Sequence, residues 1–204
     1  MKERTLIKAV LFDLGKVLLD FDKNIIVERF REKSGLTDHD IAIALDIYRV
    51  ADLERGITPA RGFYQQVVTA LNLNISYDEF AVLWSDIFTE IPEMIDFARK
   101  IKTKYQIYIA SNTDPIHFPF VFIKYKWMKE FTGFALSYEL KARKPEKEFF
   151  ERALAKFNFQ ATECAYMDDI EENVASARAV GINAILHTSP EQTIQELGKL
   201  GIRA

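Results

Sequence analysis

Four short apolar runs, spread over most of the chain, restrict its fold more than any other feature. They cover residues 9–12, 107–110, 165–167 and 183–186, and a weaker run covers 133–137. Each run is hydrophobic almost throughout, whereas a strand with one face in water alternates apolar and polar residues. We therefore expect strands of a parallel sheet whose two faces are both covered.

Helical segments separate these runs. The expected helices cover 93–104, 145–157 and 170–180; the first follows Pro92, and the last stops at Gly181, a residue type that commonly ends helices. Regular alternation of strand and helix predicts an α/β fold with a doubly wound, Rossmann-like parallel sheet and right-handed crossovers.

Residues 22–90 interrupt this alternation, because they carry helix signals and no convincing strand. Ser76 and Glu79 form a capping-box pattern before an apolar stretch. The helices expected here cover 24–33, a segment that starts at Thr37, a segment from Thr58 to about Leu71, and 80–88. We therefore expect a small helical cap, residues 19–90, inserted into a Rossmann-like core made of residues 1–18 and 91–204.

Composition excludes several classes of protein. The formal net charge is -3 and no run of Lys or Arg exceeds two, so no nucleic-acid surface is expected. No stretch reaches the roughly 18 apolar residues that a membrane span needs, and charged residues interrupt the apolar amino terminus, which argues against a signal peptide. The single cysteine, Cys164, excludes an internal disulfide and favours a cytoplasmic location. No feature of the sequence defines an oligomeric state.

Polar residues follow the predicted strands where ligands bind in an open α/β sheet, beyond the strands' carboxyl ends. Asp13 follows the first strand, 111–113 (Ser-Asn-Thr) the second, and Asp168 with Asp169 a later one, while Lys144 stands before a proline and a helix. The acids repel one another unless a cation holds them together. A carboxylate, a hydroxyl, an ammonium and paired acids are the groups that metal-assisted phosphoryl transfer requires.

In order and spacing, these segments resemble the four motifs of the haloacid dehalogenase-like superfamily. The matching segments are Val-Leu-Phe-Asp-Leu-Gly at 10–15, Ile-Ala-Ser-Asn-Thr at 109–113, Arg-Lys-Pro at 143–145 and Met-Asp-Asp-Ile-Glu-Glu-Asn at 167–173. The resemblance spans nearly the whole chain, and the helical insertion is similar to the first type of cap in that family. It implies a Mg²⁺-dependent phosphatase that acts on a small phosphorylated metabolite, with a sugar phosphate as the leading substrate class.

The resemblance also implies roles for individual residues. Asp13 is expected to be the nucleophile that forms an aspartyl-phosphate, and Lys144 to neutralise charge between it and the phosphoryl group. Ser111 and Asn112 are expected to bind that group. The metal ligands implied are Asp13, the Gly15 carbonyl and Asp169, with Asp168 acting through water or on Lys144. Asn173 either supports the metal site or is an ordinary polar residue of a helix.

Gly15 departs from the family pattern. Phosphatases of this family commonly carry an aspartate here as general acid and base, and such assistance is worth about 10² to 10⁴ in rate. Glycine leaves three alternatives: a substrate with a good leaving group, a proton supplied by the cap, the substrate or water, or a weakly active or non-catalytic regulatory protein. A 2-haloacid dehalogenase is disfavoured, because Asp168 and Asp169 resemble a metal pair.

Three further features have both a functional and a structural interpretation. Arg55 is a candidate for contact with a second anionic group of the substrate, although a structural ion pair is favoured. His117 is a candidate proton shuttle in place of the missing acid, although a structural histidine is favoured. The aromatic segment 116–128 is either a partner surface or, as we favour, a helix that faces the core.

Overall fold

The computed structural model describes residues 6–47 and 50–204. Its centre is a sheet of five parallel strands in the order β5-β4-β1-β6-β7. These strands are β1 (Ala9–Phe12), β4 (Gln106–Ser111), β5 (Gly133–Leu136), β6 (Cys164–Asp168) and β7 (Asn183–Leu186). The predicted parallel sheet is confirmed, with β1 between β4 and β6.

This strand order brings three carboxyl ends together. Phe12, the last residue of β1, lies opposite Ile109 of β4 and Met167 of β6. After β1, the chain places β4 and then β5 on one side of it, and afterwards β6 and then β7 on the other side. The loops after β1, β4 and β6 therefore meet at the position where doubly wound sheets bind their ligands.

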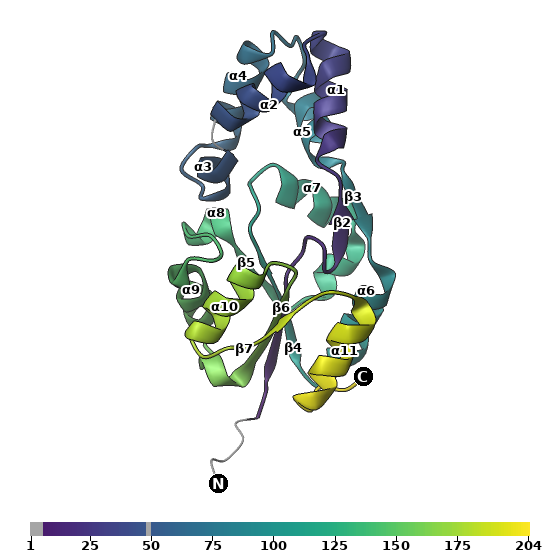
Figure 1. Ribbon diagram of the computed structural model, residues 1–204, viewed down its shortest axis with the longest axis vertical. Helices are drawn as coiled ribbons and strands as arrows, with labels where there is room; N and C mark the ends of the chain where they lie inside the picture. Colours follow the sequence, from purple (N-terminus) through teal and green to yellow (C-terminus); the bar gives the residue numbers. More distant parts are fainter. Residues whose placement is uncertain (1–5, 48–49) are drawn as a thin grey trace.

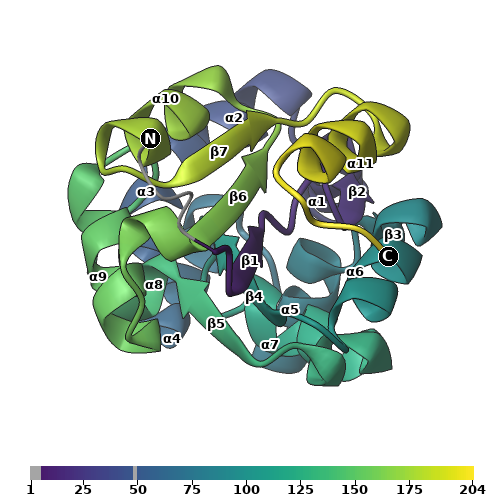
Figure 2. The ribbon, with the colours of Figure 1, turned by 90° about the horizontal axis from the view of Figure 1, so that it is seen from below.

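Helices cover both faces of the sheet, as Figure 2 shows from below. Val10 and Phe12 pack into one apolar core, and Ala9 and Leu11 pack into the other, because successive strand residues point to opposite faces. The first core includes residues of α6 (Pro92–Ile101), α7 (His117–Lys124) and α11 (Pro190–Lys199); the second includes residues of α9 (Lys147–Phe157) and α10 (Glu171–Ala179). The chain after residue 91 also contains the short helices α8 (Ser137–Leu140), η1 (Lys126–Glu130) and η2 (Ala161–Glu163).

The aromatic segment 116–128 belongs to this core. Phe118, Val121, Trp127 and Met128 are buried in the first core. The structure therefore agrees with the favoured interpretation of this segment, a helix that faces the core with its lysines outside.

Five helices gather at one end of the molecule, above the sheet (Figure 1). They are α1 (Asn24–Ser34), α2 (Asp38–Ile47), α3 (Val50–Glu54), α4 (Ala60–Ala70) and α5 (Tyr77–Ser85). Their own core is aromatic: the rings of Phe80 and Trp84 stack 6.0 Å apart, and Phe63 meets Trp84 at 5.0 Å. None of the helices in the described residues is long and apolar enough to span a membrane.

A two-stranded ribbon carries the chain into and out of the helical part. β2 (Leu19–Phe21) and β3 (Phe88–Glu90) pair antiparallel, with Phe21 opposite Phe88. The prediction of a helix over 80–88 with no strand in 22–90 was wrong at this point, since α5 ends at Ser85. Strands of three residues are too short to show a periodicity, and their pairing joins segments that are distant in the sequence.

The helical part also contacts the sheet side directly. Arg143 Nη2 lies 2.6 Å from Glu54 Oε2, and Arg55 pairs with Glu146. The Lys141 ammonium donates to the carbonyl oxygen of Gly56 at 2.7 Å. Arg55 thus makes the structural ion pair that was favoured over a contact with substrate.

Gly56→Ala should lower the free energy of unfolding more than Gly35→Ala. Both glycines have positive φ, 63° and 71°, where any side chain costs roughly 1–2 kcal/mol. A Cβ at Gly56 would in addition lie 2.3 Å from the carbonyl oxygen of Tyr138, whereas nothing lies within 4 Å at Gly35. Urea denaturation measures both losses, and equal losses would contradict close packing at Gly56.

Candidate active site

A buried lysine lies between two buried carboxylates at the carboxyl edge of the sheet. Lys144 Nζ is 2.8 Å from Asp13 Oδ1 and 2.7 Å from Asp168 Oδ2, and it donates to the Ala110 carbonyl oxygen at 3.0 Å. The side chains of Lys144 and Asp168 are 1% and 0% exposed. Three residues that are distant in the sequence thus form one compact charged cluster.

Backbone geometry fixes Asp13 and Lys144. The Asp13 N–H continues the β1–β6 ladder by donating to the Met167 carbonyl at 3.0 Å, and the Leu14 N–H donates to Asp13 Oδ1 at 2.7 Å. The Asn112 amide holds Lys144: the Lys144 N–H donates to Asn112 Oδ1 at 2.8 Å, and Asn112 Nδ2 donates to the Lys144 carbonyl at 2.9 Å. Phosphate binding by the Asn112 side chain stays a prediction, and the second N–H of Nδ2 is the donor that these two bonds leave for it.

Asp168 is held by three donors besides Lys144. Asn173 Nδ2 lies 3.0 and 3.1 Å from its two carboxylate oxygens, the Ile170 N–H donates at 2.8 Å, and the Tyr166 hydroxyl also donates. Asn173 was predicted either to support the metal site or to be an ordinary polar residue of a helix, and its hydrogen-bond partner is Asp168. Tyr166 was missed; the available signal was its position two residues before Asp168, on the same side of the strand.

Burial and charge set the protonation of the cluster. Burial raises the pKa of Asp13 to about 7, in opposition to Lys144. Burial also disfavours the charge of Asp168, but the Lys144 ammonium and the hydrogen bonds from Tyr166 and Ile170 together outweigh it, and the pKa of Asp168 is lowered. Burial likewise opposes the charge of Lys144, yet the two carboxylates raise its pKa. Lys144 is therefore held as an ammonium.

Three acids are placed where one cation could bind them all. Asp13, Asp168 and Asp169 each offer an oxygen, and these oxygens lie within 4.8 Å of one another. Burial and the charge of Asp168 raise the pKa of Asp169. Oxygen ligands of this kind suit Mg²⁺, which keeps several waters and needs few protein ligands. The predicted Gly15 carbonyl ligand stays a prediction.

A cavity of about 610 Å³ lies beside this cluster, between the sheet edge and the helical part. Leu14 and Gly15 line it from the loop after β1, Ser111 lines it from the end of β4, and Lys23 and Glu54 line it from the helical part. Ser111 is buried, and its hydroxyl donates to the Asn112 carbonyl oxygen at 3.3 Å. The predicted phosphate-binding serine therefore faces the space that a substrate would fill.

Phe21 fills the space beside Gly15. A Cβ built on Gly15 would lie 2.8 Å from Phe21 Cε1, closer than real Cβ contacts. The Phe21 ring meets Phe88 edge to face at 5.8 Å, so the β2–β3 ribbon holds it. Glycine at position 15 therefore leaves room for the Phe21 ring, and it also leaves this position without an acidic side chain.

Comparison with known proteins identifies the family. The family model of haloacid dehalogenase-like hydrolases matches residues 7–181. The chain belongs to this family. The resemblance in the four motifs is therefore confirmed, and with it the expected kind of fold.

Two relatives of this hydrolase are phosphatases. D-ribitol-5-phosphate phosphatase of Bacteroides thetaiotaomicron is 26% identical over 208 residues, which cover 94% of this chain and 97% of that protein. Sesquiterpene phosphatase astK of Aspergillus oryzae is 28% identical and covers 96% of this chain and 97% of its own.

Solved structures of a haloacid dehalogenase family enzyme from Bacteroides thetaiotaomicron are also similar. One has a TM-score of 0.80 at 26% identity, covering 89% of this chain and 94% of the other. Another, in complex with magnesium and inorganic phosphate, has a TM-score of 0.77 at 25% identity, covering 88% and 93%. A 2-haloacid dehalogenase of Pseudomonas syringae, with a TM-score of 0.67 at 17% identity over 95% of this chain and 99% of its own, shares the fold.

Lys144→Met should lower the free energy of unfolding of the hydrolase by about 3–5 kcal/mol, because it leaves buried carboxylates without their partner. Lys156→Met removes only the exposed pair with Glu139 and should cost about 0–1 kcal/mol. Urea denaturation in EDTA, which keeps divalent cations from replacing the ammonium, compares the two. Equal losses would contradict the central role of Lys144.

Gly15→Ala should destabilise the protein, and Phe21→Ala should remove most of that effect. The added Cβ meets the Phe21 ring, so the two positions should couple by about 0.5–3 kcal/mol. A double-mutant cycle of unfolding free energies measures the coupling. Additive effects would mean that the ring moves aside freely.

Proposed function

We propose that the protein is a Mg²⁺-dependent phosphatase that hydrolyses a small phosphorylated metabolite. The observation that carries this proposal is the buried Lys144 between Asp13 and Asp168, which together with Asp169 form the cluster of three acids. The names of the two phosphatase relatives support it, as does the relative bound to magnesium and phosphate.

In the proposed reaction, an oxygen of Asp13 attacks phosphorus and the bond to the leaving oxygen breaks. Water then hydrolyses the aspartyl-phosphate and releases phosphate. The Lys144 ammonium neutralises charge between Asp13 and the phosphoryl group, and Ser111 with neighbouring backbone N–H groups binds the phosphoryl oxygens. A Mg²⁺ ion bound by Asp13, Asp169 and the Gly15 carbonyl would neutralise phosphoryl charge and orient the group.

We further propose that residues 19–90 act as a cap on a core made of 1–18 and 91–204. The cavity lies between the two parts, and the Glu54–Arg143 ion pair joins them. Closing such a cap excludes water from the reacting phosphoryl group. A cytoplasmic location without a nucleic-acid partner is also proposed, from the single free Cys164 and the net charge of -3.

Two substrate classes have support from different observations. The relative that acts on ribitol phosphate supports a sugar or polyol phosphate. The described cavity wall supports a phosphate ester with an apolar part, because Ile26, Val27, Val50 and Ile87 line it, and the sesquiterpene phosphatase points the same way. The alternative raised by Gly15 is a non-catalytic binding role. It has less support, because the packing of the Phe21 ring is a second reason for glycine at this position.

Phosphate release should require Mg²⁺ and Asp13. The purified protein is given p-nitrophenyl phosphate, a panel of sugar and polyol phosphates, and isoprenyl phosphates, each with Mg²⁺ or with EDTA. We expect release with Mg²⁺ only, and none from Asp13→Asn, because this variant lacks the nucleophile.

The panel decides between substrate classes by kcat/KM. Release that persists in EDTA or in Asp13→Asn would overturn the proposed mechanism. If the folded protein binds Mg²⁺ but releases phosphate from no ester, the binding role replaces the phosphatase. Chloride release from 2-chloropropionate would instead establish the dehalogenase.

A further inference from the structure

The proposed phosphatase reaction leaves one proton without a carrier, because Gly15 stands where an acid would act. Four of the described residues that line the cavity carry titratable side chains: Lys23, Glu54, Asp114 and His117. Glu54 is paired with Arg143 at 2.6 Å, and the Lys23 side chain is exposed. Asp114 and His117 are bonded to each other and lie at the start of α7, beyond the phosphate-binding loop.

Asp114 is firmly held as a carboxylate. Its Oδ1 accepts the Ile116 N–H at 2.7 Å and the His117 N–H at 2.8 Å, and its Oδ2 accepts the Trp84 indole N–H at 3.2 Å. Its side chain is only 2% exposed. Although burial opposes the charge, His117 and these bonds lower the pKa of Asp114. When Nδ1–H is bonded to this carboxylate, Nε2 is the nitrogen that can gain and lose a second proton, and the carboxylate stabilises the imidazolium that results.

His117 leaves its second nitrogen without a partner. Nδ1 is bonded to Asp114 Oδ2, while Nε2 is buried and meets no hydrogen-bond partner among the described residues. The ring is held between aromatic groups, 5.1 Å from Trp84 and 5.6 Å from Phe88. Buried polar atoms are nearly always bonded, so an unpartnered nitrogen on a residue that lines the cavity points to a partner atom on a bound ligand.

We propose that His117, oriented by Asp114, is the general acid and base of this phosphatase. His117 enters the cycle as an imidazolium: when Asp13 attacks phosphorus and the bond to the leaving oxygen breaks, Nε2–H gives its proton to that oxygen and His117 becomes a neutral imidazole. In the second step Nε2 takes a proton from the attacking water, the bond between phosphorus and Asp13 breaks, and Asp13 is restored as a carboxylate. The proton count balances over one turnover, and Asp114 is a positioning residue.

Leaving groups of different basicity test this proposal on the whole protein. An alkyl phosphate needs an acid for departure of its oxygen, whereas p-nitrophenolate leaves without one. His117→Gln should lower kcat/KM for an alkyl phosphate by about 10²- to 10⁴-fold and leave kcat/KM for p-nitrophenyl phosphate nearly unchanged. The variant should also give a burst of p-nitrophenolate followed by slow turnover, because the second step lacks its base.

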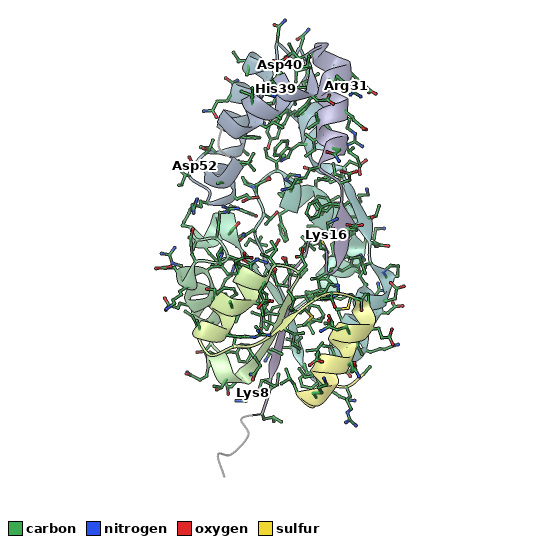
Figure 3. All side chains as sticks on the ribbon, viewed as in Figure 1. Lys8, Lys16, Arg31, His39, Asp40 and Asp52 are labelled. Atoms are coloured by element: carbon green, nitrogen blue, oxygen red, sulfur yellow. The ribbon has the colours of Figure 1, made fainter. Side chains whose placement is uncertain are left out.

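Matched variants serve as controls. His39→Gln changes an exposed histidine at the far end of the cap (Figure 3) and should alter neither rate. Asp114→Asn should show the same selective loss on the alkyl ester. Retained kcat/KM for p-nitrophenyl phosphate shows that each variant is folded.

Three results would overturn the assignment to His117: no loss on either ester, equal loss on both, or the selective loss in Glu54→Gln instead. The pH profile of kcat/KM for the alkyl ester should lose one limb in His117→Gln, measured with Asp114, Glu54 and Lys23 present as the other titratable groups of the cavity. A different result would show that the phosphatase proposal itself fails: the unaltered protein would release no phosphate, or Asp13→Asn would still release it.

Discussion

The ammonium of Lys144 is the group on which the site depends. Asp13 and Asp168 are both withdrawn from water and would repel each other strongly without it. Lys144 reaches both only because β1 lies between β4 and β6 and because Asn112 ties the Lys144 backbone to the end of β4. The position of the Lys144 ammonium therefore depends on the strand order, on the hydrogen bonds to Asn112 and on the charges of the two carboxylates. Asp169 adds further negative charge, which is why the cluster suits a divalent cation.

The β2–β3 ribbon connects the proposed cap, residues 19–90, to this cluster. The ribbon pairs the segment that enters the helical part with the segment that leaves it, and it contains both Phe21 and Phe88. Phe21 closes the space beside Gly15, and Phe88 contacts the ring of His117. Trp84 belongs to the aromatic core of the cap and also donates to Asp114. The stability of the cap and the shape of the substrate cavity therefore rest on the same aromatic side chains.

The local pattern of the chain determined the sheet and most of its helices. Continuous apolar runs specified buried parallel strands, and an acid or hydroxyl at each strand end specified which residues would meet. Asp13 and Asp168 were predicted on this basis, and Lys144 from its place before a proline and a helix; the structure brings the three into contact. Their catalytic roles stay predictions. These signals are local, because periodicity and capping depend on residues within one or two turns of each other.

Only the tertiary structure decided how the site is completed. The partner of Asn173, the hydroxyl of Tyr166 on Asp168, the Phe21 ring beside Gly15 and the bond between Asp114 and His117 were not predicted. Each contact joins residues within six positions of each other, and it depends on the orientation that the strand ends, the loop turns and the β2–β3 pairing give to the side chains. Asp114 and His117 are close in the sequence, but a carboxylate three residues before a histidine is common in loops. It acquires meaning when packing buries the pair and places it on the wall of the cavity.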